Sequence, residues 1–452
     1  MKSFFFHEAL FPSGWSKDVR IDVDEKGTIT SSVVNSMPNE NDEIINCAIP
    51  AMPNCHSHVF QRTMAGLTEY KTSENDSFWS WRNLMYEYAN KINSEQLYHI
   101  ARYVYHEMLL CGYSSVCEFH YIHRELNNPE DTNSMSQAII QAAHDAGIEL
   151  TLLPVLYQQS HVDGTPLTKS QERFYLSNSD YIELYQSLEK QLYECQKLGI
   201  CFHSLRAVSI ENMQIVLDEL GNNHPIHIHI SEQVAEVEQL LEHTNMRPVE
   251  YLFHNFEVNS NWSLIHATHL NDNEINLIAK SGAIAGLCPM TEANLGDGVF
   301  PLPEYFRQNG KIAIGSDSHI VINPFQELQI LEYSQRLQLR QRVVSSNSKT
   351  SHVGTFLWNN AVSGSKLSGQ FCGNGFNVGD KANWIEIDTH NPLLTNLNGE
   401  QCLDTLVFVD SNAIASTYIN AHKTEKQNDK LIENYKKNTQ IIEIVIIFIF
   451  FC

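Results

Sequence analysis

The segment PIHIHISE at residues 225–232, together with GICFHSLRAV at residues 199–208, decides how this chain folds. Each is a short β-branched or apolar run that ends in polar side chains, as a buried strand of a parallel sheet does. Six similar runs lie outward from them along the chain: NCAIPAMPN (46–54), SSVCEFHY (114–121), ELTLLPVLY (149–157), WSLIHATHL (262–270), GAIAGLCP (282–289) and KIAIGSDSH (311–319).

Longer amphipathic stretches separate these eight strand candidates. In SEQLYHIARYVYHEMLLCG (94–112) and SQAIIQAAHDAG (136–147), apolar residues recur at helical spacing and the stretch ends in a glycine. Strand–helix alternation at this period predicts a parallel sheet in the α/β class. Eight such units predict a closed (β/α)8 TIM barrel.

The two ends of the chain have a different pattern. Residues 1–48 and about 370–423 contain short alternating strands with Gly and Asp turns, so we expect them to pair into one small β-sandwich domain. The barrel would occupy residues 49–369, and residues 424–452 would form an atypical C-terminal tail. The long segment 158–180 is a candidate active-site lid, because structureless loops of this length are usually either functional or disordered.

The last residues of the tail, IIEIVIIFIFFC (441–452), are strongly apolar. They are too few to span a bilayer, which needs about 20 apolar residues, and we expect no stable membrane insertion. A buried terminal strand, a tail that touches a membrane and a frameshifted reading frame are the alternatives. We favour a frameshift or a structurally idle tail.

The composition is that of an ordinary globular protein with a large acidic excess. The chain has 53 Asp and Glu against 30 Lys and Arg, a net charge of −23. This excess argues against nucleic acid as a partner, because phosphate binding needs a basic surface. It still permits a small anionic substrate, since a few buried arginines can reverse the field in a pocket. The ten cysteines form no CxxC pair, which predicts isolated buried thiols in a reducing cytosol.

Four residues near the ends of predicted strands form a candidate metal site. In a TIM barrel the chemistry lies at the carboxyl ends of the strands. His56 and His58 close the first strand, and histidines at i and i+2 of an extended segment point the same way. His229 lies near the end of the fifth strand and Asp317 at the end of the eighth. Three imidazoles and one carboxylate suit Zn²⁺ or Fe²⁺ with an open position for water.

The fourth strand candidate indicates a single ion. Two-metal barrel hydrolases often bridge their ions with a carbamylated lysine at that position. The segment CFHSLRAVS (201–209) offers His203 and Arg206 instead. We therefore expect one Zn²⁺, with Fe²⁺ or another divalent ion as the alternative.

Other polar residues at the strand ends are candidates for proton transfer. Glu232 follows His229 by three residues, where a carboxylate can reach a water on the ion and pass a proton to a leaving amine. The alternative for Glu232 is a solvated acid at the start of the next helix. His266 ends the sixth strand and is preferred to His269, which would begin the following loop. His227 lies deeper in its strand than His229, so we expect a packed histidine there.

These motifs resemble the amidohydrolase superfamily, and within it the formimidoylglutamate deiminase family. The resemblance covers most of residues 4–345, and FWSWR (78–82) and CPMTEANLGDG (288–298) are its most specific parts. It rests on PNCHSHVFQRTMAGL (53–67), DSFWSWRNLMY (76–86), EFHYIH (118–123), HSLRAV (203–208), HIHISEQVAEV (227–237), LIHATHL (264–270), GLCPMTEANLGDGVFPLPEY (286–305) and GSDSHIVINPFQELQILEYSQRLQLRQR (315–342). After about Lys423 the chain departs from the family, which usually continues with a polar helix.

The resemblance implies an activity and a set of site residues. The implied reaction converts N-formimidoyl-L-glutamate and water into N-formyl-L-glutamate and ammonia, in histidine degradation, and the implied enzyme is a cytoplasmic homodimer with zinc. The implied metal ligands are His56, His58, His229 and Asp317. The implied proton-handling residues are Glu232 and His266, with Asp317 sharing the proton of the water. The implied substrate-binding set is Gln61, Arg82, Tyr121, His203 and Arg206.

Two arginines suit a substrate with two carboxylates. Arg82 follows the first predicted strand and Arg206 the fourth, so both can overhang the barrel mouth and make bidentate pairs. A surface salt bridge is the alternative for each. Phe78, Trp79 and Trp81, next to Arg82, can be simple packing or substrate contacts.

Two other functions stay open on the sequence. Another single-metal aminohydrolase would act on a purine or pyrimidine ring, and would have an aromatic-lined pocket with few cations. A catalytically inactive metal-binding barrel would lack Glu232 or a ligand such as Asp317, and both are present.

Overall fold

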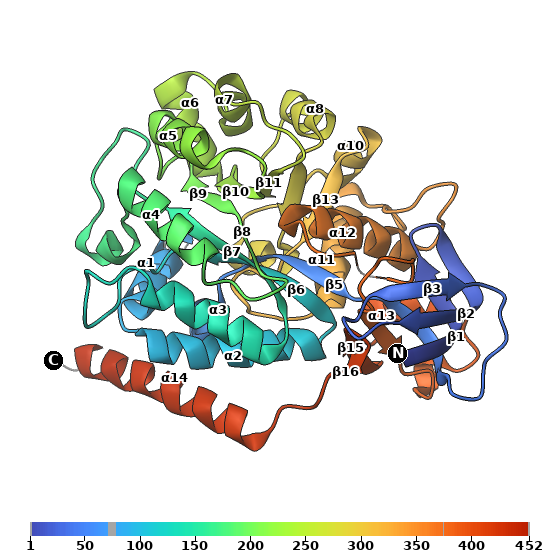
Figure 1. The fold of residues 1–452 in the computed structure, drawn as a ribbon. Coiled ribbons are helices and arrows are strands. Elements are labelled where there is room, and N and C mark those ends of the chain that lie inside the picture. The colour runs from blue at the N-terminus through green and yellow to red at the C-terminus, as the bar shows by residue number, and fades with distance from the viewer. Residues whose placement is uncertain (1, 71–77, 374, 451–452) are drawn as a thin grey trace.

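All eight predicted strands form, and they pair in parallel in the predicted order around a nearly closed (β/α)8 barrel (Figure 1). The computed structural model describes residues 2–70, 78–373 and 375–450, and their side chains apart from those of 78–80 and 441–450. The barrel strands are β5 (Met52–Ser57), β6 (Tyr113–His120), β7 (Glu149–Leu156), β9 (Ile200–Ser204), β10 (Ile226–Ile230), β11 (Trp262–His266), β12 (Ile284–Leu287) and β13 (Lys311–Ile314), while β8 (Lys197–Leu198) pairs with β7.

Helices lie outside this ring of strands. The helices between barrel strands are α1 (Phe78–Ala89), α2 (Ser94–Leu110), α3 (Ser134–Ala146), α4 (Asn178–Glu189), α5 (Ile210–Leu220), α6 (Val234–Thr244), α7 (Pro248–Asn255), α8 (Asp272–Ser281), α9 (Pro289–Leu295) and α10 (Leu302–Arg307). Those that follow the last strand are α11 (Pro324–Leu339), α12 (Val353–Gly369), α13 (Gly399–Phe408) and α14 (Asp429–Phe450). The two helices predicted at 94–112 and 136–147 correspond to α2 and α3.

The barrel closes where β13 meets β5. Ser57 and Asp317 form a parallel bridge, the His58 backbone N–H donates to the Asp317 carbonyl at 3.1 Å, and that of Asp317 donates to the His56 carbonyl at 3.0 Å. A Cβ on Gly315 would lie 2.7 Å from the His56 Cβ, so glycine is needed for this approach. The seam of the barrel is thus built from the residues predicted to bind metal.

The other end of the barrel is closed by the C-terminal end of α12. His227 Nε2 donates to the Ser368 carbonyl at 2.8 Å, and Thr151 Oγ1 donates to the Gly369 carbonyl at 2.8 Å. These bonds satisfy carbonyls that a helix end leaves without partners. His227 is therefore a packed histidine, as predicted.

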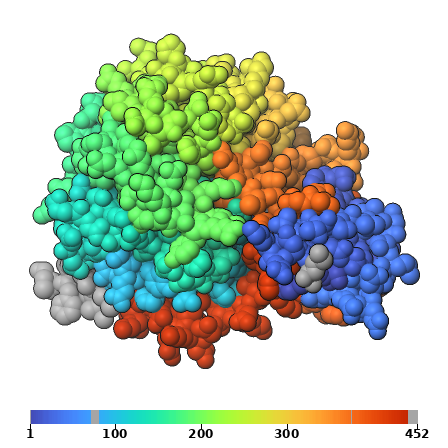
Figure 2. Space-filling model, viewed as in Figure 1, coloured from blue at the N-terminus to red at the C-terminus, as the bar shows by residue number. Residues whose placement is uncertain are grey.

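The two ends of the chain meet in one seven-stranded sheet beside the barrel. Its order is β16 (His422–Lys423), β15 (Ile414–Ile419), β14 (Trp384–Ile387), β4 (Glu43–Pro50), β1 (Lys2–Phe11), β2 (Gly14–Val23) and β3 (Ile29–Val33). In Figure 2 the N-terminal segment, in blue, lies at one side of the molecule next to later segments in orange, while the last part of the chain, in red, runs along the bottom. Phe4, Phe6 and Trp384 belong to a core of its own, whereas Leu10 and Ile49 belong to the barrel core.

The two ends of the chain pair in one small domain, as predicted, and its hydrogen-bonded strands form a continuous sheet. One detail differs from the sequence prediction. The first strand candidate, 46–54, is divided between two sheets, because β4 runs to Pro50 and β5 begins at Met52. The residues of NCAIPAMPN stay apolar where the chain passes from β4 to β5, because both strands are buried there.

Two further segments take definite structure. Within 158–180, the predicted lid, the 3₁₀ helix η2 (Lys169–Phe174) buries Gln171 and Phe174. Helix α14 continues through residues 441–450, which excludes the terminal-strand alternative, and it lies against α2, where the Tyr103 and Tyr435 rings stack at 4.1 Å (Figure 1). In the part of the chain that the structure describes, no helix combines the length and apolarity that a membrane crossing requires. The nine described cysteines are all free thiols, as predicted, but only six are buried, because Cys111 and Cys372 are half-buried and Cys195 is exposed.

Candidate active site

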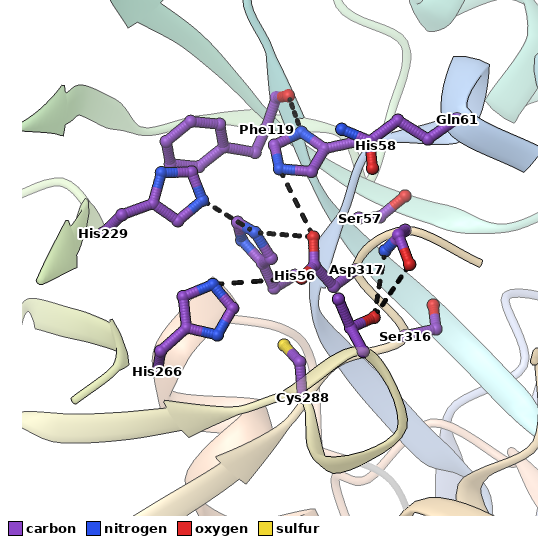
Figure 3. Close-up of polar contacts among 12 residues, drawn as sticks. His56, Ser57, His58, Gln61, Phe119, His229, His266, Cys288, Ser316 and Asp317 are labelled. Atoms are coloured by element: carbon purple, nitrogen blue, oxygen red, sulfur yellow. Dashed lines mark hydrogen bonds and ion pairs between the residues drawn. The ribbon is translucent and has the colours of Figure 1, made fainter. Parts of the chain in front are cut away.

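Four side chains from three strand ends converge at the mouth of the barrel (Figure 3). His56 Nε2 lies 3.1 Å from His229 Nε2 and 3.4 Å from Asp317 Oδ1, and His58 Nε2 lies 3.5 Å from the same Asp317 oxygen. One ligand atom each from His56, His58 and His229 fits within 4.8 Å of the others. The structure therefore brings together all four residues predicted to bind metal.

The imidazoles are oriented and neutral, as metal ligands must be. His58 Nδ1 donates to the Phe119 carbonyl at 2.8 Å, and His229 Nδ1 donates to the His203 carbonyl at 3.0 Å. Because a carbonyl can only accept, Nδ1 carries the hydrogen in both rings. The Nε2 atoms of His58 and His229 therefore keep a lone pair that can bind a metal ion. Burial holds the pKa of His56, His58 and His229 below the ordinary value. Three neutral imidazoles and one carboxylate fit a divalent cation.

His266 lies beside this point, among carboxylates. Its Nδ1 is 3.3 Å from Glu292 Oε1, and its Nε2 is 3.6 Å from Glu232 Oε1 and 3.8 Å from Asp317 Oδ2. Although burial opposes it, Glu232 and the other two carboxylates raise the pKa of His266 to about 10. Burial raises the pKa of Glu232 to about 7, close to the value that suits a proton-transfer group at neutral pH.

The backbone at these strand ends is held in an unusual conformation. Ser231, His266 and Asp317 have φ values of 53°, 67° and 44°, in the left-handed region that non-glycine residues rarely adopt. Glu236 accepts the backbone N–H groups of Ser231 at 3.1 Å and of Glu232 at 3.0 Å. These bonds fix the turn that presents Glu232, and such strain is typical of functional sites.

A pocket of about 700 Å³ opens above the convergence point. It is lined by His58, Gln61, Trp81, Arg82, Met85, Tyr86, Tyr121, His203, Ser204, Arg206, His229, Glu232, Gln233, Glu236, His266, Leu295 and Asp317. All five residues of the expected substrate-binding set are among them. Gln61 Nε2 donates to the Tyr121 hydroxyl at 3.0 Å, which fixes two of the five against each other.

Arg206 and Arg82 supply positive charge to the pocket. Arg206 is 9% exposed, so it is not part of a surface salt bridge, and its Nη1 donates to the Ser160 carbonyl at 3.0 Å. Arg82 is half-buried and its guanidinium carbon lies 5.6 Å from the centre of the Tyr86 ring. Burial lowers the pKa of Arg82, which an anionic ligand would offset.

Other predicted residues are placed as follows. His269 does not line the pocket, and its Nε2 donates to the Asp297 carbonyl at 2.9 Å instead. Trp81 lines the pocket. The side chains of Phe78 and Trp79 are not among the side chains that the structure describes.

Sequence reasoning gave no role to four residues that shape the site. Glu292 contacts His266 and also accepts the Cys288 backbone N–H at 2.8 Å. Asp297 accepts a hydrogen bond from Gln233, and burial together with the nearby Glu232 raises the pKa of Asp297 to about 9. Tyr86 and Tyr157 lie next to the arginines. The conspicuous CPMTEANLGDG segment was the available signal for Glu292 and Asp297.

Comparisons with known proteins agree with this geometry. The model of the amidohydrolase family matches residues 47–353. A formimidoylglutamate deiminase from Pseudomonas aeruginosa is 40% identical over 412 residues, 90% of this chain and 91% of the relative. A crystal structure of an amidohydrolase from Brucella melitensis superposes with a TM-score of 0.93 at 36% identity, covering 98% of this chain and all of that one. A 5'-deoxyadenosine deaminase from Methanococcus vannielii is 28% identical over 226 residues, 49% of this chain and 51% of the relative.

Proposed function

This chain belongs to the amidohydrolase family and is a homologue of a formimidoylglutamate deiminase, and from that premise we propose that it hydrolyses N-formimidoyl-L-glutamate to N-formyl-L-glutamate and ammonia. One observation carries the proposal. A single pocket holds three of the four candidate ligands, the pair Glu232 and His266, and two arginines, and the fourth ligand, His56, contacts His229 and Asp317. The first group suits hydrolysis of a carbon–nitrogen bond, and the arginines suit a substrate with two carboxylates.

A divalent ion held by His56, His58, His229 and Asp317 would supply Lewis acidity that lowers the pKa of a water molecule. Asp317, 3.8 Å from His266, faces the place of that water and would take up its proton as the water oxygen adds to the formimidoyl carbon, while His266, whose pKa the nearby carboxylates raise to about 10 despite burial, is already protonated and would stabilise the developing negative charge. Glu232 then protonates the nitrogen that leaves as ammonia, a role suited to a carboxyl whose pKa burial raises to about 7. Arg82 and Arg206 hold the two carboxylates, and Gln61, Tyr121 and His203 orient the chain between them.

We further propose that the ion is zinc and that the enzyme is a cytoplasmic homodimer. The ligand set supports Zn²⁺, although Fe²⁺ shares it. The family resemblance supports the compartment and the assembly, and the free thiols accord with a reducing environment.

A second candidate is deamination of a nucleoside or free base. The partial match to a 5'-deoxyadenosine deaminase favours it, but Arg206 buried in the pocket argues against a neutral ring.

Ammonia release tests the proposal directly. Purified protein would be assayed with formimidoylglutamate, adenosine, guanine and cytosine, and the same sample analysed for metal. We expect release from formimidoylglutamate alone, with one equivalent of a divalent metal per chain. Release from a ring substrate instead would contradict the proposal.

A further inference from the structure

Three side chains form a buried hydrogen-bonded cluster at the end of the pocket that Arg82 and Arg206 line, which we call the arginine end. Tyr86 lies on α1, Tyr157 follows β7 and Gln171 belongs to η2. Gln171 Nε2 lies 2.8 Å from the Tyr157 hydroxyl and 3.2 Å from the Tyr86 hydroxyl, and the two hydroxyls are 3.2 Å apart. All three residues are at most 5% exposed.

The direction of these hydrogen bonds follows from their donors. The Thr168 backbone N–H can only donate, and it lies 3.0 Å from one end of the Gln171 amide, so that end must be the oxygen. The amide nitrogen therefore faces the two phenols. Its two hydrogens therefore serve Tyr157 and Tyr86. Arg206 Nη1, which is also only a donor, approaches the Tyr157 oxygen at 3.5 Å.

When donors and acceptors in this cluster are counted, one hydroxyl hydrogen has no acceptor within it. With Gln171 and Arg206 as donors to its oxygen, Tyr157 gives its own hydrogen to Tyr86. The Tyr86 oxygen then accepts from Gln171 and Tyr157, and its hydrogen meets no other acceptor among the residues that the structure describes. Tyr86 lines the pocket one helical turn from Arg82, on the same face of α1.

We propose that Tyr86 is a further substrate-binding residue, whose hydroxyl donates a hydrogen bond to one of the two carboxylates that Arg82 and Arg206 hold. Tyr157 and Gln171 are positioning residues, because they act through Tyr86 and Arg206. The inference rests on the proposed function, since it assigns this donor to one carboxylate of formimidoylglutamate. A hydroxyl donor to a carboxylate makes a charge-assisted hydrogen bond, which is stronger than a neutral one.

The test is Tyr86→Phe, which removes the hydroxyl and keeps the ring. We expect KM for formimidoylglutamate to rise about 10- to 100-fold, as expected for one hydrogen bond to a charged group, with kcat nearly unchanged. Tyr157→Phe should raise KM less, because Gln171 still orients Tyr86. Tyr181→Phe is the matched control. Tyr181 is also buried and donates to the Pro154 carbonyl at 3.0 Å, but it does not line the pocket, so its loss should lower the melting temperature and leave KM unchanged.

Two substrate analogues separate binding from a structural role. N-formimidoyl-4-aminobutyrate lacks the α-carboxylate, and N-formimidoyl-L-glutamine replaces the γ-carboxylate with an amide. The effect of Tyr86→Phe on kcat/KM should disappear with one analogue and persist with the other. An equal effect on both analogues and the parent substrate, or an unchanged KM alongside normal ammonia release by the parent enzyme, would overturn the assignment of Tyr86 alone. Absence of ammonia release from formimidoylglutamate by the parent enzyme would overturn the proposed function and this assignment together.

Discussion

The two ends of the pocket are built from different parts of the fold. The ligand end stands on β5, β10, β11 and the β13–β5 seam, and backbone hydrogen bonds fix it. The arginine end stands on α1 and on the segments that follow β7 and β9, and side-chain hydrogen bonds hold it. The comparison teaches that the barrel frame fixes the candidate metal ligands, while loops and one helix carry the two arginines, a division that TIM barrels generally allow.

The strongest test of the ligand end is His229→Ala. Removing one of the proposed ligands should leave less than stoichiometric metal and lower kcat/KM by more than about 1,000-fold, because the Lewis acid is lost. Metal analysis and ammonia release on one sample give both values. His227→Gln, in the same strand but bonded to α12, should keep its metal and its activity. Full metal and normal turnover in His229→Ala would show that the strand-end cluster is not the reaction centre.

Glu232→Gln should lower kcat by about 100- to 10,000-fold while metal stays bound, since it removes a proton donor and not a ligand. Because burial raises the pKa of Glu232 to about 7, the carboxyl loses its proton as pH rises through 7. The parent rate should therefore fall above that pH, and the variant should lose this dependence. Glu238→Gln, on the exposed side of α6, serves as the control. Near-normal turnover in Glu232→Gln would refute the assigned role.

At the arginine end, Arg206→Met should lower kcat/KM by about 100-fold, mainly through KM, because a bidentate carboxylate pair contributes to binding more than to the reacting atoms. Steady-state kinetics separate the two constants. Arg307→Met, at an exposed ion pair with Glu304, should change neither. A loss confined to kcat would place Arg206 with the reacting groups and remove the distinction between the two ends.

The last expected effect is on stability and leaves the reaction aside, and it concerns a carboxyl beside the ligand end. Glu118 is fully buried and accepts the Val59 backbone N–H at 2.9 Å, and burial raises its pKa to about 8. Between about pH 4.5 and 8 the unfolded chain releases this proton while the folded chain keeps it, so this contribution to stability falls as pH rises, by up to about 1.4 kcal/mol per pH unit.

Glu118→Gln should remove that contribution and flatten the pH dependence of the unfolding free energy, measured by urea titration at several pH values. The exposed Glu189→Gln should leave the slope as it is in the parent protein. An unchanged slope in Glu118→Gln would mean that the buried carboxyl is ionised in the folded protein.

Much of the fold followed from local pattern, and where the pattern failed there is a physical cause. Strand–helix alternation predicted all eight barrel strands, because buried parallel strands are continuous apolar runs. The division at Pro50 and Met52 was missed, since two buried strands in different sheets have the same apolar character. The pairing between β4 and β14 joins the two ends of the chain in one small domain, as their shared pattern of short alternating strands predicted.

The sequence by itself determined which residues meet at the barrel mouth as candidates for the chemistry. Histidines and an aspartate at strand ends must gather at the mouth once the strands close into a barrel. Only the tertiary structure decided their partners: the Glu292 carboxylate beside His266, the seam between Ser57 and Asp317, and the tyrosine pair behind the arginines. The candidate ligands follow from side-chain chemistry at fixed positions in a repeating fold, whereas hydrogen-bond partners depend on how separate segments pack, which spacing along a chain does not encode.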